Sequence, residues 1–175
     1  MTAAETHSTA IVRPVQASDL SALVEMNNQS VPAVSPLTLA ELKELVTSAL
    51  ACLVAEIDGT PAGLLLCLKE GTSSYKSPNY AWVSANRSTF AYIDRIFIAD
   101  SARGQRAGEA LYQALFELPE TQGRPFVCEV NSRPANPGSM RFHKRLGFTE
   151  IGEMDHGDKA VVFLERAANS TGSPS

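Results

Sequence analysis

Glu129 is the first candidate for acid–base chemistry, because it is a carboxylate within Pro125–Asn131 (PFVCEVN) whose neighbours from Phe126 to Val130 are otherwise apolar. A carboxylate among apolar neighbours holds a proton more readily than one in water, which suits a general base. Asp94, in the stretch Phe90–Ala99, is the rival base, although the adjacent Arg95 could hold it in an ion pair. The sequence therefore predicts proton abstraction and leaves the choice between the two carboxylates open.

A predicted strand, Phe90–Ala99, leads through a glycine-containing turn directly into a predicted helix, Arg103–Leu118. Such a junction aims unpaired N–H groups and the positive end of the helix dipole at one point. Gly104 and Gly108 let an anion approach the backbone, and two arginines add positive charge. The turn lacks G-K-[ST] and G-x-G-x-x-G, but it favours a phosphate or pyrophosphate. The predicted contacts are Arg103, Gly104, Gln105, Arg106, Ala107, Gly108 and Glu109.

A short helix with a polar stripe is predicted after Asn136, with Asn136 as N-cap, Pro137 at the first helical position and Gly147 just past its end. Asn136, Ser139 and His143 fall at i, i+3 and i+7, so they share one face of this helix. A polar stripe on a helix that flanks the core indicates a face turned toward a ligand.

These segments resemble the GNAT superfamily, the acyl-CoA-dependent N-acyltransferases. Arg103–Gly108 (RGQRAG) is similar to its R/Q-x-x-G-x-G/A pyrophosphate loop, with Arg106 in the place of the middle glycine. The specific motifs lie within residues 90–148, whereas the order of elements matches over about residues 11–166. Three further segments match the family: Glu129–Asn131 (EVN), Asn136–Ser139 (NPGS) and Phe142–Phe148 (FHKRLGF). The segment Ser77–Tyr80 (SPNY) looks like a little-characterised bacterial branch.

The resemblance implies transfer of an acetyl group from acetyl-CoA, as co-substrate, to a primary amine by direct attack. It implies that Asn136 and Ser139 lie beside the pantetheine arm and that His143 replaces a tyrosine that protonates the leaving thiolate. A CoA-binding regulatory module without turnover stays open, because of Arg106 and the missing tyrosine. A protein or peptide acceptor is a further alternative. The oxyanion-binding N–H groups are expected near Ile96, Phe97 and Ile98.

The acceptor is predicted to meet the loop Asn27–Ser35, the segment Tyr75–Trp82 and the C-terminal hairpin. Tyr75–Trp82 lies within Glu70–Thr89, which is expected to be a long irregular loop. That segment carries three large aromatic residues. Aromatic faces pack apolar groups and attract cations, which favours a small cationic amine with an apolar or aromatic body. The predicted acceptor contacts are Asn27, Asn28, Tyr80 and Trp82.

The order of predicted elements is β-α-α-β-β-β-α-β-α-β-β, which indicates an α/β fold with a mixed sheet of about six to seven strands and helices on both faces. Ser18 is expected to cap the first helix, and Thr38 with Glu41 forms a capping box for the second. Asp58-Gly59 indicates a β-hairpin. One domain is expected over residues 9–167, with flexible tails at 1–8 and 168–175.

The chain of 175 residues carries 15 basic and 19 acidic residues and has a net charge of −4, which argues against a nucleic-acid partner. Its longest apolar run, Ala62–Leu68, is far too short to span a membrane, so no membrane association is expected. Cys52, Cys67 and Cys128 lie in apolar runs and are predicted to be buried core residues of a cytoplasmic protein. No metal site is predicted, and a homodimer is left open.

Overall fold

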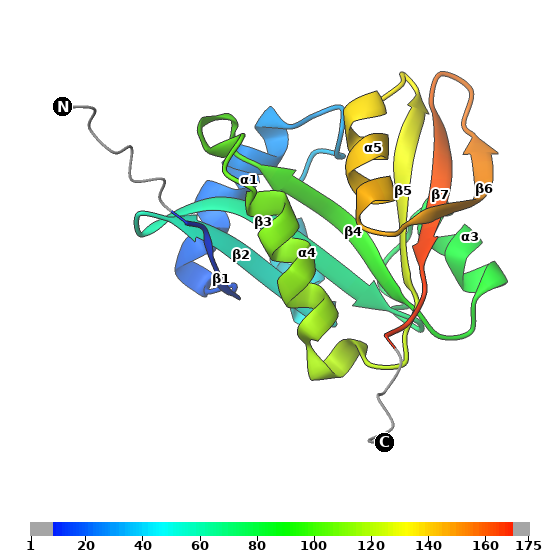
Figure 1. The fold of residues 1–175 in the computed structure, drawn as a ribbon, viewed down its shortest axis with the longest axis horizontal. Helices are drawn as coiled ribbons and strands as arrows, with labels where there is room; N and C mark the ends of the chain where they lie inside the picture. The colour runs from blue at the N-terminus through cyan, green and yellow to red at the C-terminus, as the bar shows by residue number, and fades with distance from the viewer. Residues whose placement is uncertain (1–8, 170–175) are drawn as a thin grey trace. The chain divides into compact units, whose positions relative to one another are not determined.

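The computed structural model describes residues 9–169, and its centre is a seven-stranded mixed β-sheet (Figure 1). The strand order is β1-β2-β3-β4-β5-β7-β6. Strand β4 runs parallel to β5, and β7 is antiparallel to both β5 and β6. This architecture confirms the predicted α/β fold class. The strands are β1 (Ile11–Pro14), β2 (Ala51–Ile57), β3 (Thr60–Lys69), β4 (Ala91–Ile98), β5 (Phe126–Arg133), β6 (Thr149–Asp155) and β7 (Ala160–Arg166).

Five α-helices accompany these strands in the described chain. They are α1 (Leu20–Gln29), α2 (Leu39–Ser48), α3 (Pro78–Asn86), α4 (Ala107–Glu117) and α5 (Pro137–Arg145). The predicted capping box is present at α2, where the Thr38 N–H donates to Glu41 Oε2 (2.8 Å) and the Glu41 N–H donates to Thr38 Oγ1 (3.1 Å). The prediction that Ser18 caps α1 is wrong, because Ser18 lies inside a 3₁₀ turn, Ala17–Asp19, that precedes the helix.

Helix α3 corrects the prediction of an irregular loop over Glu70–Thr89. Ser77 has an extended backbone and its side chain accepts the Tyr80 N–H, while Pro78 occupies the first helical position. A serine N-cap followed by proline is an ordinary signal for the start of a helix, and it can be recognised in the sequence. The helix was missed because its apolar residues do not recur at a clear helical period.

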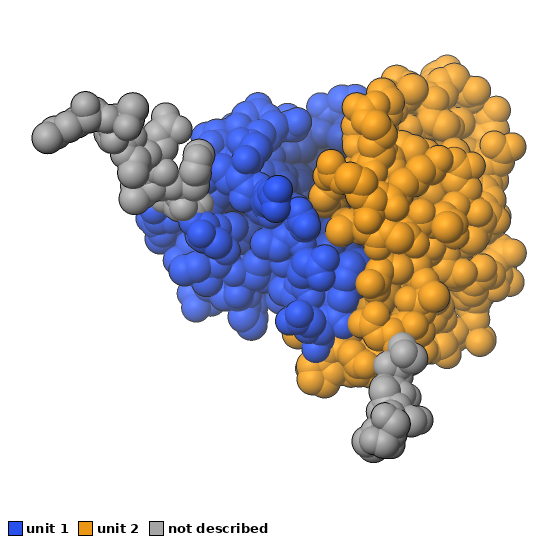
Figure 2. Space-filling view, in the orientation of Figure 1, with its two compact units in different colours: residues 1–46, 51–66, 95–117 blue, residues 47–50, 67–94, 118–175 orange. Residues whose placement is uncertain are grey.

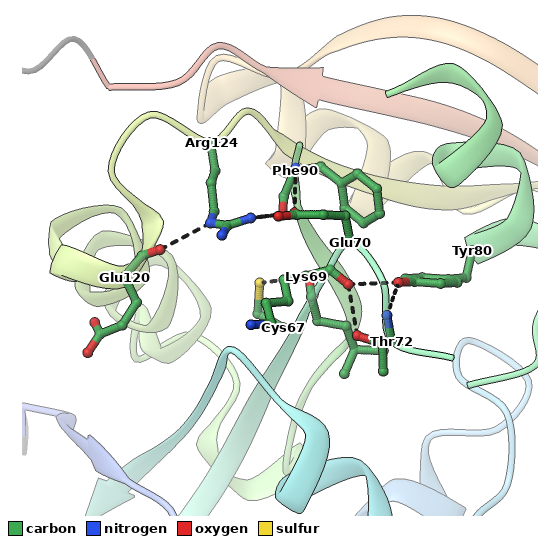
Figure 3. Close-up of polar contacts among 9 residues, drawn as sticks. Cys67, Lys69, Glu70, Thr72, Tyr80, Phe90, Glu120 and Arg124 are labelled. Atoms are coloured by element: carbon green, nitrogen blue, oxygen red, sulfur yellow. Dashed lines mark hydrogen bonds and ion pairs between the residues drawn. The ribbon is translucent and has the colours of Figure 1, made fainter. Parts of the chain in front are cut away.

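Polar contacts, most of them part-buried, tie the start of the segment that carries α3 to β3 and to the chain just before β5 (Figure 3). The Tyr80 hydroxyl donates to the Lys69 carbonyl (2.7 Å) and accepts the Thr72 N–H (3.0 Å). Glu70 forms an ion pair with Arg124. The segment is therefore held firmly at its base.

The described chain divides into two compact units, coloured separately in Figure 2. Unit 1 contains the chain up to Val46, Ala51–Leu66 and Arg95–Glu117. Unit 2 contains Thr47–Leu50, Cys67–Asp94 and the chain from Leu118 onward. The predicted domain, residues 9–167, takes in parts of both units. Of the predicted tails, 1–8 and 168–175, residues 1–8 and 170–175 lie outside the described residues.

The cysteines are placed largely as predicted, with Cys67 and Cys128 buried and Cys52 half-buried. Burial raises the pKa of the Cys52 thiol to about 12. Within residues 9–169, no helix combines the length and the apolar character needed to cross a membrane. The same residues contain no group of three or more His, Cys, Asp or Glu side chains placed to hold a metal ion.

Trp82, predicted to contact the acceptor, packs α3 onto the sheet of unit 2. Its indole stacks on Phe163 of β7, with ring centroids 4.0 Å apart and planes 5° from parallel. Gly152 of β6 leaves room for this ring, since a Cβ at that position would lie 2.5 Å from an indole carbon. A strand neighbour without a side chain thus makes room for the ring, and the contact of Trp82 with the acceptor stays a prediction.

We expect Gly152→Ala to lower the free energy of unfolding by about 1–3 kcal/mol, because the added methyl forces Trp82 off its stack. Gly138→Ala is the matched control: this glycine lies in α5, and a Cβ there meets nothing within 4 Å. The control should be neutral or stabilising by up to about 1 kcal/mol, since alanine favours helix. Urea denaturation of both variants measures the difference, and equal values would contradict the packing role of Trp82.

Candidate functional site

The turn between β4 and α4, in unit 1, contains two residues in the left-handed backbone conformation. The φ angle is +82° at Gly104 and +57° at Arg106. Glycine adopts this conformation freely, whereas a residue with a Cβ is disfavoured by about 1–2 kcal/mol. Arg106 therefore has a glycine-like backbone at the position where the family motif has glycine. The loop geometry survives the substitution and carries some strain.

The N-terminus of α4 presents N–H groups at this turn. The Ala110 N–H makes the helical bond to the Arg106 carbonyl (3.0 Å), so the N–H groups of Ala107, Gly108 and Glu109 have no acceptor within the helix. A Cβ built on Gly104 would meet no atom within 4 Å, so the space beside this backbone is open. Open backbone, N–H donors and a positive helix end together fit a pyrophosphate.

The charged side chains of the turn are exposed. Arg103 Nε lies 3.0 Å from Asp100 Oδ1, and both side chains are mostly in solvent, so this ion pair contributes little and an anion can replace it. Gln105 Nε2 donates to the Ser101 carbonyl (3.4 Å), and Arg106 is exposed. Arg103 and Arg106 are thus both available to a phosphate.

The predicted oxyanion donors, Ile96, Phe97 and Ile98, form the end of β4. The described ladder between β4 and β5 joins Ala91 to Phe126 and Tyr92 to Val127, near the start of both strands. The three residues lie further along β4 than these pairs. Phe97 is buried, and the other two are half-buried.

Asn27 and Asn28, predicted to bind the acceptor, hold the loop after α1. Asn27 is fully buried; its Nδ2 donates to the Ser35 carbonyl (2.9 Å) and its Oδ1 accepts from Arg95 Nη1 (2.9 Å). The Asn28 side-chain amide binds the backbone of Leu37 twice: Oδ1 accepts the Leu37 N–H (2.9 Å) and Nδ2 donates to the Leu37 carbonyl (3.0 Å). These side chains satisfy loop backbone, and their contact with the acceptor stays a prediction.

The Glu129 carboxylate lies in unit 2, half-buried and held by two donors. The Tyr92 hydroxyl of β4 is 2.8 Å from both Glu129 oxygens, and Asn79 Nδ2 of α3 donates to Oε1 (3.2 Å). Burial, together with the Glu129 and Asp94 charges, raises the pKa of Tyr92 well above its usual value. Tyr92 therefore stays protonated and acts as a donor to the carboxylate.

Asp94 shares its face of the sheet with Glu129. Tyr92 pairs with Val127, and side chains alternate along a strand, so Tyr92, Asp94, Val127 and Glu129 lie on one face. The Tyr75 hydroxyl donates a short hydrogen bond to Asp94. Both candidate bases are thus in unit 2, each with a tyrosine partner. Arg95, considered as an ion-pair partner of Asp94, is directed at Asn27 and Ser35 instead.

Tyr92 was not assigned a site role from the sequence, whereas Tyr75 and Asn79 lie in the segment Tyr75–Trp82 that was predicted to line the acceptor pocket. Tyr92 is two residues before Asp94 in a strand, so its position on the same face could have been inferred from alternation. For Asn79 the available signal was its place just after a Ser-Pro helix start. The contact with Glu129 spans 50 positions of sequence, and the sequence contains no indication of it.

Helix α5 begins as predicted, since Asn136 Oδ1 accepts the Ser139 N–H (3.2 Å) with Pro137 at the first helical position. His143 is buried rather than on the helix surface, and its ring packs edge-on against Phe148. Its Nδ1 lies 2.8 Å from the Ser139 carbonyl. A carbonyl only accepts, so the proton is on Nδ1 and Nε2 carries the lone pair.

Burial also lowers the pKa of His143, which favours the neutral ring at pH 7. A neutral ring with its proton engaged at Nδ1 has no proton at Nε2 to donate. The proton-donor role remains a prediction, and this geometry weighs against it.

An open pocket of about 630 Å³ lies beside the start of α3 in unit 2. Tyr80 forms part of its wall with its ring, while its hydroxyl is engaged with backbone. Tyr75 and Lys76 also line it, together with serine and threonine hydroxyls. Two of the three aromatic residues singled out in the sequence thus meet at one pocket, and Trp82 is not among its lining residues.

Residues 20–148 match the acetyltransferase (GNAT) family, and this chain belongs to that family. The match includes the β4–α4 turn, Glu129 and α5. An uncharacterized N-acetyltransferase of Methanocaldococcus jannaschii is 32% identical over 98 residues, which cover 55% of this chain and 38% of that relative.

Solved structures share the fold. Ard1 from Thermoplasma volcanium superposes with a TM-score of 0.73 at 18% identity, over 91% of this chain and 98% of that one. A phosphinothricin acetyltransferase from Sinorhizobium meliloti, solved in complex with acetyl-CoA, has a TM-score of 0.70 at 20% identity, over 95% and 94% of the two chains.

We expect Gly104→Val to raise the dissociation constant for CoA at least tenfold, about 1.4 kcal/mol, because the side chain fills the space beside the turn. Gly123→Val is the matched control, since Gly123 has a φ of +77° and equally open surroundings but lies before β5. Both variants carry the same backbone strain. Calorimetric titration with CoA compares them, and equal affinities would remove the turn from the CoA site.

We expect Arg106→Gly to stabilise the fold by up to about 1 kcal/mol, because it relieves the left-handed strain, and to leave CoA affinity nearly unchanged. Asp58→Gly is the comparison: Asp58 has a φ of +51°, but aspartate tolerates this conformation better, so its gain should be smaller. Thermal unfolding and CoA titration test both effects. Loss of CoA binding would show that the Arg106 side chain is itself a ligand.

Proposed function

We propose that this protein is an N-acetyltransferase that moves an acetyl group from acetyl-CoA to a primary amine by direct attack. The observation that carries the proposal is the Glu129 carboxylate, half-buried in the apolar strand β5 and oriented by Tyr92 and Asn79. A carboxylate fixed in this way suits removal of a proton from an amine. Membership of the GNAT family supports the choice of acyl donor.

The donor would be held by the β4–α4 turn, whose N–H groups and Arg103 suit its pyrophosphate. Acetyl-CoA supplies an acetyl thioester: the amine nitrogen forms the new bond to carbon, and the C–S bond breaks. Glu129, with Asp94 as its rival, takes the proton that the amine loses. N–H groups at Ile96–Ile98 would stabilise the charge that develops on the carbonyl oxygen.

The proposed acceptor is a small amine. Asp94 and Glu129 place negative charge on one face of unit 2, which attracts an ammonium group. Tyr75 and Tyr80 offer apolar surface at the neighbouring pocket, although Lys76 there disfavours a second positive charge on the acceptor. An amine with one positive charge and an apolar or aromatic body therefore suits this region best.

We expect Glu129→Gln to lower turnover by about 10²–10⁴-fold while CoA affinity stays within twofold, because the amide cannot take up the proton. Asp94→Asn tests the rival base, and Glu153→Gln, an exposed carboxylate of β6, is the matched control. Turnover of acetyl-CoA is measured over a panel of small amines and short lysine peptides, beside calorimetric CoA binding.

The outcomes separate the alternatives. Full activity of Glu129→Gln with loss in Asp94→Asn moves the base to Asp94. CoA binding without turnover on any amine would favour a regulatory module, and faster acetylation of peptides than of every small amine would favour a peptide acceptor.

A further inference from the structure

We propose that Asn79 and His156 are positioning residues that orient the Glu129 carboxylate through a chain of hydrogen bonds. The inference rests on the function proposed above for Glu129. It concerns two residues outside residues 90–148, where the specific family motifs lie: one is on α3, within Ser77–Tyr80, and the other is on the β6–β7 hairpin.

The chain runs from the protein surface to the carboxylate in two steps. His156 Nε2 lies 2.9 Å from Asn79 Oδ1, and Asn79 Nδ2 donates to Glu129 Oε1 at 3.2 Å. An amide oxygen only accepts, so the proton of this contact is on His156 Nε2. If the amide were turned the other way, its oxygen would face the Glu129 carboxylate and would lose the hydrogen bond from the imidazole. His156 therefore sets the direction in which Asn79 donates.

Both residues are held in place by their own elements. Asn79 is the second residue of α3, whose start is fixed by the Ser77 cap. His156 lies at the tip of the hairpin, between Asp155 and Gly157. Arg133 of β5 binds both of these neighbours, since its Nη2 donates to Asp155 Oδ1 (2.6 Å) and to the Gly157 carbonyl (2.7 Å). The hairpin tip is thus tied to the strand that carries Glu129.

Asn79 adds a constraint that Tyr92 alone does not supply. The Tyr92 hydroxyl is equidistant from the two Glu129 oxygens, so it fixes the position of the carboxylate. Asn79 contacts only one of the two oxygens, Oε1, and so makes them inequivalent. This contact sets the orientation of the carboxylate. Asp94 and Tyr75 are titratable groups close to this site, and both act electrostatically on Tyr92.

The test compares two asparagines of the same helix. Asn86, near the end of α3, is exposed and donates to the Trp82 carbonyl, so it serves as the control. We expect Asn79→Ala to lower kcat on the order of tenfold with KM for acetyl-CoA unchanged, and Asn86→Ala to change neither. His156→Ala should lower kcat in the same direction, and His156→Gln, which keeps an N–H donor, should recover most of the loss.

A second readout does not depend on turnover. Asn79→Asp places a carboxylate beside Glu129, so the titration midpoint of the Glu129 side chain, followed by carbon NMR and assigned with Glu129→Gln, should move to higher pH. Asn86→Asp should leave it in place. Where the wild type acetylates an amine, the acidic limb of its kcat/KM profile should move in the same way in Asn79→Asp.

The two proposals fail separately. An unchanged Glu129 midpoint in Asn79→Asp would overturn the positioning role, whether or not the protein is active. Equal kcat values for Asn79→Ala and Asn86→Ala in an active enzyme would also overturn it. A wild type that acetylates no amine, but whose Glu129 midpoint moves in Asn79→Asp, would keep the hydrogen-bond chain and refute the proposed function.

Discussion

The hydrogen bond from the buried Tyr92 hydroxyl to Glu129 allows a carboxylate to lie inside an apolar strand. A carboxylate removed from water must recover hydrogen bonds from the protein. Tyr92 provides one from β4, the parallel neighbour of β5, and Asn79 provides another from α3. Helix α3 is therefore more than a cover over the sheet: its capped start brings an amide to the carboxylate, and Trp82 seats the helix on β7 through Phe163.

His143 meets the same requirement in a different way. It is buried, but its own helix supplies the partner, because the Ser139 carbonyl lies one turn earlier. This local solution fixes the ring tautomer and, with burial, favours the neutral form. Glu129 depends instead on residues far away in sequence. Of the three residues that the sequence marked for proton transfer, His143 is thus held within a single helix, whereas Glu129 is held by two other elements, β4 and α3.

At the β4–α4 turn, Arg106 has the left-handed backbone conformation typical of glycine, although the glycine of the family motif is absent. Arg106 adopts a left-handed φ of +57°, and Gly104 does so beside it. The N–H groups at the start of α4 depend on the path of the backbone, so an arginine can replace a glycine at a modest cost in strain. For this reason a departure from a sequence motif is a weak argument against the structure that the motif describes.

The sequence by itself determined the features that depend on near neighbours. The fold class, the Thr38–Glu41 capping box and the start of α5 at Asn136 were all predicted, because caps and periodicity act within one or two turns. The tertiary structure decided what the polar side chains contact. Asn27 was expected at a ligand and is buried against a loop, and the donors to Glu129 come from 37 and 50 positions away. Partners at such separations are set by strand register and by which element covers which face of the sheet. Neither can be inferred from the pattern of neighbouring residues in the sequence.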